Sequence, residues 1–149
     1  MTQMKTNESV MDIEWGRQKR ESVVVCVTDQ TSGQTLIERG AQLAREQGME
    51  LRVLSVLLRG KQNAQSAMAL EALFQSAMEQ GATMSVYYSE HVWTTADHFL
   101  KRCRVRHLVV GRPRLGGSFV PKLYKAYGDV PLHVIEAEHQ GAQVVVAAR

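Results

Sequence analysis

The sequence predicts one doubly wound α/β domain built on a mostly parallel, five-stranded sheet. Short runs of β-branched and other apolar residues alternate along the chain with segments whose apolar residues recur at helical spacing. Two of these helical segments end on the same tripeptide, Glu-Gln-Gly, at residues 46–48 and 79–81, and each tripeptide leads directly into an apolar run. A repeated strand-helix unit favours parallel strands, whose right-handed crossovers place helices on both faces of the sheet.

Five apolar runs bounded by turn residues are predicted to form this sheet. The first, which follows Ser22 at residues 23–27, consists of four valines and one cysteine and is typical of a strand buried on both faces. The other four are residues 51–58, 84–88, 107–110 and 132–137. A sixth run, at residues 143–147, follows a turn at Gln140 and Gly141 and predicts an extra strand at the C-terminus.

Four helices are predicted between the strands. The residues expected to face the sheet are Leu36, Ile37, Gly40, Leu43 and Ala44 in the first helix, Ala67, Leu70, Phe74, Ala77 and Met78 in the second, and Val92, Ala96, Phe99, Leu100 and Cys103 in the third. Gly48 and Gly81 are suited to end the first two helices, because glycine readily adopts a left-handed cap. The fourth helix is expected to start after Ser118 and to close at Gly128.

Length and composition are those of one soluble globular domain. The chain has 149 residues, of which 44% are hydrophobic and 22% charged. Residues 1–20 are polar and without periodicity, which predicts a flexible tail, and the domain is expected to span residues 21–149. No apolar run approaches the length of about 18 residues that a membrane span needs. Cys26 and Cys103 form no C-x-x-C motif, which favours a reducing compartment, so we expect a cytoplasmic protein without a membrane partner.

Positive charge is concentrated in one part of the chain. No acidic residue lies between Asp97 and Asp129, whereas eight lysines and arginines do, which indicates an anionic partner near this segment. The basic residues at 101–106 are expected at the end of the third helix, where cations complement the helix dipole. No nucleic-acid-binding motif accompanies them, so nucleic acid is not an expected partner.

The candidate ligand site is the crevice between the loops that follow the first and fourth strands. In an open α/β sheet, ligands bind where the strand order reverses, at the carboxyl ends of the strands. The loop after the first strand, T-D-Q-T-S-G-Q-T, contains Thr28 and Asp29 and opens a helix. Its backbone N–H groups would face an anion and its side chains could bind a ribose; the alternative is an ordinary turn and helix cap.

The loop after the fourth strand, G-R-P-R-L-G-G-S, suits a phosphate. It combines arginines, glycines that allow close approach to the backbone, and a serine at a helix start. The candidate residues are Gly111, Arg112, Arg114, Gly116, Gly117 and Ser118. The alternative is a surface loop with solvated arginines.

Other kinds of site find less support in the sequence. Five histidines have no spacing that would place metal ligands on one helix face, namely His91, His98, His107, His133 and His139. No G-x-S-x-G motif supplies a catalytic serine, so no catalytic residue and no metal are expected. The aromatic residues Tyr87, Tyr88 and Trp93 could stack on a base or flavin, or could form part of the core.

From Ser22 to Glu136 the chain resembles the universal stress proteins. The matching pieces are V-V-V-C-V-T, L-I-E-R-G-A-Q-L-A-R-E-Q-G-M-E-L, H-L-V-V-G-R-P-R and G-D-V-P-L-H-V-I, and the likeness is greatest to the version of this domain in the potassium-responsive sensor kinase KdpD. The resemblance implies the strand order 3-2-1-4-5, a homodimer formed through the final strand, and a regulatory role without catalysis. A sensor kinase or another signalling protein would be a further partner.

Some members of that family bind ATP, with adenine near strand two and phosphates on a loop of the form G-x-x-G followed by nine residues and G-S or G-T. In this chain Val56 would lie by the adenine and Gly111 matches the first glycine. Arg114 stands in place of the second glycine, and Tyr124 and Lys125 stand in place of the final pair. The resemblance therefore implies a degenerate crevice for ATP, AMP or another adenine nucleotide.

The sequence thus predicts a non-enzymatic stress-response or signalling domain with a degenerate nucleotide crevice. An alternative from another class is a flavodoxin-like, FMN-binding electron carrier. It rests on the loop T-D-Q-T-S-G-Q-T, which is similar to the phosphate loop of that family.

Overall fold

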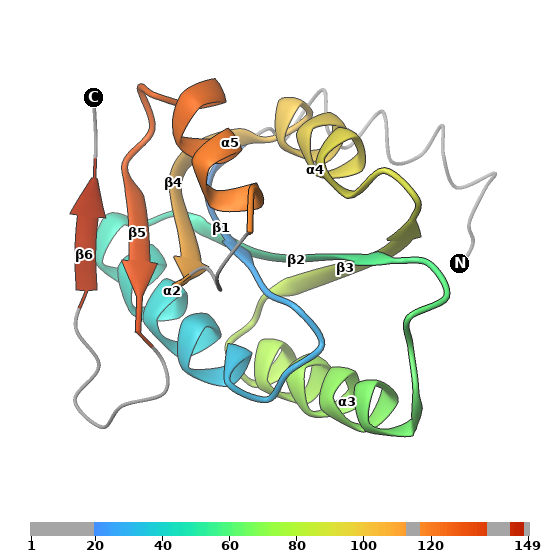
Figure 1. Cartoon of the computed structure of the whole chain (residues 1–149). Helices are drawn as coiled ribbons and strands as arrows, with labels where there is room; N and C mark the ends of the chain where they lie inside the picture. Colours follow the sequence, from blue (N-terminus) through green and yellow to red (C-terminus); the bar gives the residue numbers. More distant parts are fainter. Residues whose placement is uncertain (1–19, 113–116, 137–143, 148–149) are drawn as a thin grey trace, which may run out of the picture.

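The six strands of the described residues join in one sheet, in the order β3-β2-β1-β4-β5-β6. The computed structural model describes residues 20–112, 117–136 and 144–147 (Figure 1). The strands are β1 (Glu21–Cys26), β2 (Glu50–Leu58), β3 (Thr83–Ser89), β4 (Arg104–Gly111), β5 (Leu132–Ile135) and β6 (Val144–Ala147). The first five are parallel, and β6 pairs antiparallel with β5. The order 3-2-1-4-5 and the extra C-terminal strand are therefore confirmed.

Two helices cover each face of the sheet (Figure 1). Helices α2 (Gly33–Gln47) and α3 (Ala64–Glu79) pack on one face, and α4 (Val92–Lys101) and α5 (Phe119–Ala126) on the other. Strand β1 lies in the middle, and its residues Val23, Val24 and Val25 are completely buried. Because successive side chains of a strand point to opposite faces, this valine run contributes to both layers of the core.

Helix α2 lies unusually close to β1. Its residue Gly40 is buried, and a Cβ atom at this position would overlap Cγ2 of Val25. The helix ends as predicted at Gly48, which adopts the left-handed conformation with φ of 67°. Within the part of the chain that the structure describes, no helix is long and apolar enough to cross a membrane.

The predicted sheet-facing stripe of α3 is correct at Leu70 and Ala77 and wrong at Ala67, Phe74 and Met78. Phe74 and Met78 are 45% and 67% exposed, and Ala67 is exposed as well. The buried face consists of Ser66, Ala69, Leu70, Leu73, Ser76 and Ala77. Helix faces are predicted from large apolar side chains, whereas α3 turns mostly small residues inward.

A capping interaction explains how one of the buried polar residues of α3 is accommodated. The Asn63 side chain accepts a hydrogen bond from the Ser66 backbone N–H at 2.9 Å, and the Asn63 N–H donates to the Ser66 hydroxyl at 3.1 Å. This reciprocal pair satisfies two N–H groups at the start of the helix. The Ser66 hydroxyl therefore keeps its hydrogen bonds although it is buried.

The basic segment at 101–106 does not all belong to a helix. Helix α4 ends at Lys101, so Cys103 lies beyond it and the prediction that Cys103 shares its face is wrong. Arg104 and Arg106 belong to β4, and each lies 3.6 Å from the carboxylate of Glu21 on β1. Lys101, in the last turn of α4, and Arg102, at its C-cap, do lie at the end of the helix, and Lys101 also pairs with Asp97 at 3.0 Å.

The end of α5 is tied to α4 instead of being closed by glycine. The helix stops at Ala126, two residues before Gly128, and Tyr127 takes the cap position. The Tyr127 hydroxyl donates a hydrogen bond of 2.7 Å to Asp97 Oδ1. This bond holds the pKa of Asp97 below its usual range, and burial together with the Asp97 charge raises the pKa of Tyr127.

Candidate functional site

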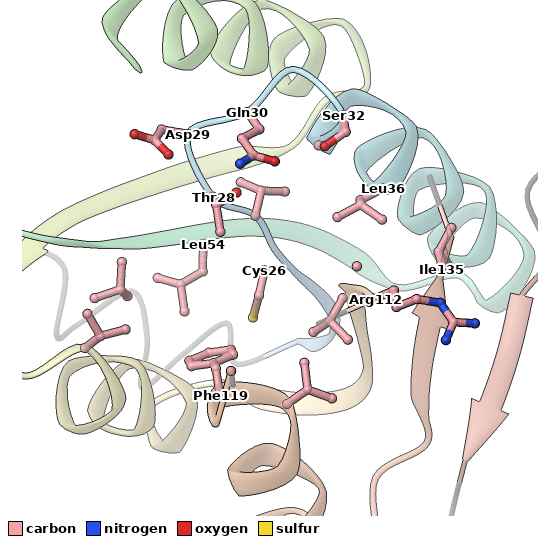
Figure 2. Close-up of a pocket in the computed structure, with 18 of the residues that line it drawn as sticks. Cys26, Thr28, Asp29, Gln30, Ser32, Leu36, Leu54, Arg112, Phe119 and Ile135 are labelled. Atoms are coloured by element: carbon pink, nitrogen blue, oxygen red, sulfur yellow. The ribbon is translucent and has the colours of Figure 1, made fainter. Parts of the chain in front are cut away.

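A cleft of about 690 Å³ opens at the carboxyl ends of β1 and β4. It lies between the loop that follows β1 and the start of α5, and Figure 2 shows the side chains around it. This is the point where the strand order reverses, since β2 follows β1 on one side and β4 lies on the other. The volume is within the range of small-molecule sites in proteins.

The floor and walls of the cleft are apolar. They are formed by Cys26, Val27, Leu54, Val56, Val92, Val110, Phe119 and Val120, with Leu36 and Ile135 near α2. Cys26 lies at the centre of the view in Figure 2, and burial raises the pKa of its thiol to about 12. The thiol therefore stays protonated near neutral pH and serves as part of an apolar surface.

Polar side chains surround the opening. Thr28, Asp29, Gln30 and Ser32 come from the loop after β1, and Arg112 and Glu136 come from the ends of β4 and β5. Arg112 lies across the opening from Asp29 in Figure 2. The Arg112 Nε lies 2.9 Å from Glu136 Oε2, so the guanidinium is already engaged by a carboxylate.

The N-terminus of α2 is arranged differently from the prediction. The backbone N–H groups of Gly33, Gln34 and Thr35 donate to the carbonyls of Gln30, Thr31 and Ser32, at 3.0, 2.9 and 3.2 Å. The expectation that the N–H groups of this loop point at an anion is therefore wrong for Gly33, Gln34 and Thr35. These three residues form the ordinary turn that was the alternative interpretation. The reason is a series of i to i+3 turns that tightens the entry to the helix.

The structure brings together most of the residues that the sequence singled out. Thr28, Asp29, Val56, Gly111, Arg112 and Gly117 all line the cleft. Ser118 occupies the N-cap position of α5, makes no side-chain capping bond and is not part of the lining. Arg114 and Gly116 lie outside the described residues, and whether any of these residues binds a ligand stays a prediction.

Sequence reasoning missed Glu136 and the aromatic wall at Phe119. The signal for Glu136 was available, because it is a charged residue near the end of the predicted fifth strand (residues 132–137), and parallel strands end at the same edge of a sheet. Phe119 contacts Trp93 edge to face, with ring centroids 5.8 Å apart. Trp93 therefore belongs to the packing behind the cleft, whereas Tyr87 and Tyr88 are exposed on β3.

A histidine pair lies outside this cleft. His107 Nδ1 on β4 is 3.1 Å from His133 Nε2 on β5, beside a hollow of about 230 Å³ under α2. Burial lowers the pKa of both imidazoles, with further contributions from Arg106 on His107 and from His107 on His133. In the part of the chain that the structure describes, no three metal-binding side chains gather together.

The histidine pair predicts that stability decreases at mildly acidic pH. Because both pKa values are lower in the folded chain than the ordinary 6.5, the unfolded chain binds these protons more readily. The free energy of unfolding should be constant at pH values well above the ordinary pKa of 6.5, and it should fall as the pH is lowered below that value. Urea unfolding at a series of pH values measures this, and His133→Gln should flatten the decline. The exposed His98→Gln serves as the control, and an equal decline in both variants would contradict the prediction.

Comparison with known proteins identifies the fold. No protein-family model matches the sequence, and no curated protein is significantly similar to it. Solved structures do match: the universal stress protein UspA from Lactobacillus plantarum superposes with a TM-score of 0.61 at 14% identity, covering 76% of this chain and 96% of that one. A universal stress protein from Archaeoglobus fulgidus matches with a TM-score of 0.56 at 16% identity, covering 82% and 98%.

A third match is a universal stress protein in complex with cAMP, with a TM-score of 0.55 at 14% identity, covering 81% of this chain and 100% of that one. The flavodoxin alternative is wrong, because flavodoxins order their strands 2-1-3-4-5 and this sheet is ordered 3-2-1-4-5. The likeness to the domain of KdpD stays a prediction. In its strand order and its structural neighbours, the chain has the fold of the universal stress proteins.

Proposed function

We propose that the protein is a non-enzymatic stress-response or signalling domain that binds an adenine nucleoside or nucleotide in the cleft between β1 and β4. The observation that carries this proposal is the cleft itself, an apolar cavity at the switch point of the sheet with a polar opening. Two structural neighbours with TM-scores of 0.55 and 0.51 are described as complexes with cAMP and with dAMP.

The lining offers suitable partners for a base and a sugar. A purine needs an apolar slot, which Leu54, Val56 and Phe119 supply. A ribose needs hydrogen-bond acceptors for its hydroxyls, and the Asp29 carboxylate in the same lining could supply them. Burial raises the pKa of the Cys26 thiol in the described lining, so this cysteine is not an activated nucleophile, and this supports binding without catalysis.

Filling the adenine slot tests the proposal. Val56→Trp places an indole in the cleft, whereas Leu58→Trp, two residues along the same strand, adds one at a position that is 44% exposed and outside the lining. A ligand at about a hundred times its dissociation constant stabilises a protein by about 2.7 kcal/mol. Adenosine, AMP, cAMP or ATP should therefore raise the unfolding temperature of the unaltered chain and of Leu58→Trp, but not that of Val56→Trp.

Two outcomes would count against the proposal. The first is no shift of the unfolding temperature with any of the four ligands at millimolar concentration. The second is an equal shift in Val56→Trp, which would place the ligand elsewhere on the protein. The expected partners, a second copy of the chain and a sensor kinase or other signalling protein, stay predictions, as does the cytoplasmic location.

A further inference from the structure

We propose that the cleft selects nucleosides and singly charged nucleotides against polyphosphates, and that Glu136 sets this selectivity. The inference rests on the proposed function, because it specifies which adenine compounds the same cleft accepts. Three features of the described lining carry it: an engaged arginine, an engaged helix N-terminus and an excess of carboxylates.

Arg112 is the cation of the described lining that could reach a phosphate, and it is held by Glu136. The contact between Arg112 Nε and Glu136 Oε2 is 2.9 Å, a short charge-assisted bond, and both side chains line the cleft. The Arg112 and Glu136 side chains are 59% and 34% exposed, so water screens the pair from the side of the arginine and less from the side of the carboxylate. A phosphate that binds the Arg112 guanidinium must first displace the Glu136 carboxylate. Because Glu136 stays in the lining, the phosphate would then lie close to this negative charge.

The N-terminus of α2 does not provide another binding site for a phosphate in place of Arg112. Helix N-termini attract phosphates chiefly through N–H groups without partners. Here the N–H groups of Gly33, Gln34 and Thr35 donate to carbonyls of the preceding turn. A phosphate at this point would have to break those bonds to gain new ones.

The balance of charge around the opening also opposes polyanions. Among the described lining residues, two side chains carry a carboxylate, Asp29 and Glu136, and one carries a guanidinium, Arg112. Each further negative charge on a ligand therefore adds repulsion at short range, in a cleft whose apolar walls screen charges less than water does. The contacts of a base with the apolar slot and of a ribose with the Asp29 carboxylate do not require a phosphate, so a nucleoside keeps both.

Calorimetric titration of the full chain tests the inference with four compounds of rising charge. These are adenosine, cyclic AMP with one negative charge, AMP with close to two, and magnesium-free ATP with more. We expect the affinity to fall in that order. In Glu136→Gln, AMP and ATP should bind about tenfold more tightly, because the carboxylate is removed and Arg112 is released, while adenosine changes less than about twofold. Glu71→Gln, which removes the same charge from an exposed position on α3 outside the lining, should leave all four affinities unchanged.

Salt dependence gives a second measurement that needs no variant. Repulsion is screened by salt, so the affinity for AMP relative to adenosine should rise with ionic strength in the unaltered chain. A site in which Arg112 and Arg114 bind phosphate directly predicts the opposite trend and the tightest binding for ATP.

The outcomes separate this inference from the proposed function. Binding of ATP as tight as that of adenosine, or an AMP affinity that falls with salt, would overturn the selectivity and leave the nucleotide site standing. An unchanged ratio of AMP to adenosine affinity in a folded Glu136→Gln variant would overturn the role of Glu136. If adenosine and the three nucleotides all fail to bind, the proposed function fails and this inference fails with it.

Discussion

Replacing Leu73 by alanine is expected to lower the free energy of unfolding by about 2–5 kcal/mol. Leu73 is completely buried in the core cluster between α2, α3 and the sheet, and it faces Gly33 at the start of α2. Removing its side chain leaves a cavity between α2, α3 and the sheet, and the tightly packed sheet cannot move to fill this cavity. Urea unfolding followed by circular dichroism measures the loss.

The neighbouring Phe74→Ala is the matched control for this prediction. Phenylalanine loses more side-chain atoms than leucine in such a change, yet Phe74 is 45% exposed and the cost should stay below about 1 kcal/mol. A larger loss in Phe74→Ala than in Leu73→Ala would show that α3 is rotated towards the face that the sequence alone predicts.

Substituting alanine for Gly40 should also destabilise the protein, by about 1–3 kcal/mol. Alanine favours a helix over glycine by about 1 kcal/mol, so a net loss means that packing outweighs helix propensity. The new methyl group would overlap Cγ2 of Val25 and lie 3.3 Å from Cδ1 of Leu51, and both side chains belong to buried strands. Helix α2 would have to move away from β1.

A double-mutant cycle identifies the cause of this loss. Val25→Ala removes the methyl group that Gly40→Ala would strike, so the two changes together should cost less than the sum of their separate costs. Thermal or urea unfolding of the four proteins gives the coupling energy. Additive costs, or a Gly40→Ala variant as stable as the original chain, would contradict the close packing of α2 on β1.

The α/β class and the place of the cleft could be predicted from local signals, whereas the strand order 3-2-1-4-5 was implied only by the resemblance to the universal stress proteins. The valines of β1 and the two Glu-Gln-Gly exits indicate parallel strands joined by helices. Thr28 comes just after β1 and Gly111 is the last residue of β4, and both strands end at one edge of the sheet, so the loops that follow them had to meet. These inferences need only the period of the apolar residues and the rule that crossovers are right-handed.

The remaining features depend on contacts between distant segments. The face that α3 buries is decided by what fits against α2 and the sheet, and small residues fit there better than Phe74. The pairing of Arg112 with Glu136 and of His107 with His133 follows from the register of β4 against β5. The register between two strands cannot be derived from the spacing of apolar residues in a single sequence.

The central position of β1 has a consequence for how the protein is made. Its neighbour β4 comes later in the chain, after two strands and three helices. Pairings between distant segments form slowly, because the chain between them must first be closed into a loop. The cleft has one wall from each of these two strands. A chain emerging from the ribosome would therefore form this cleft only after β4 has been synthesised and has joined the sheet.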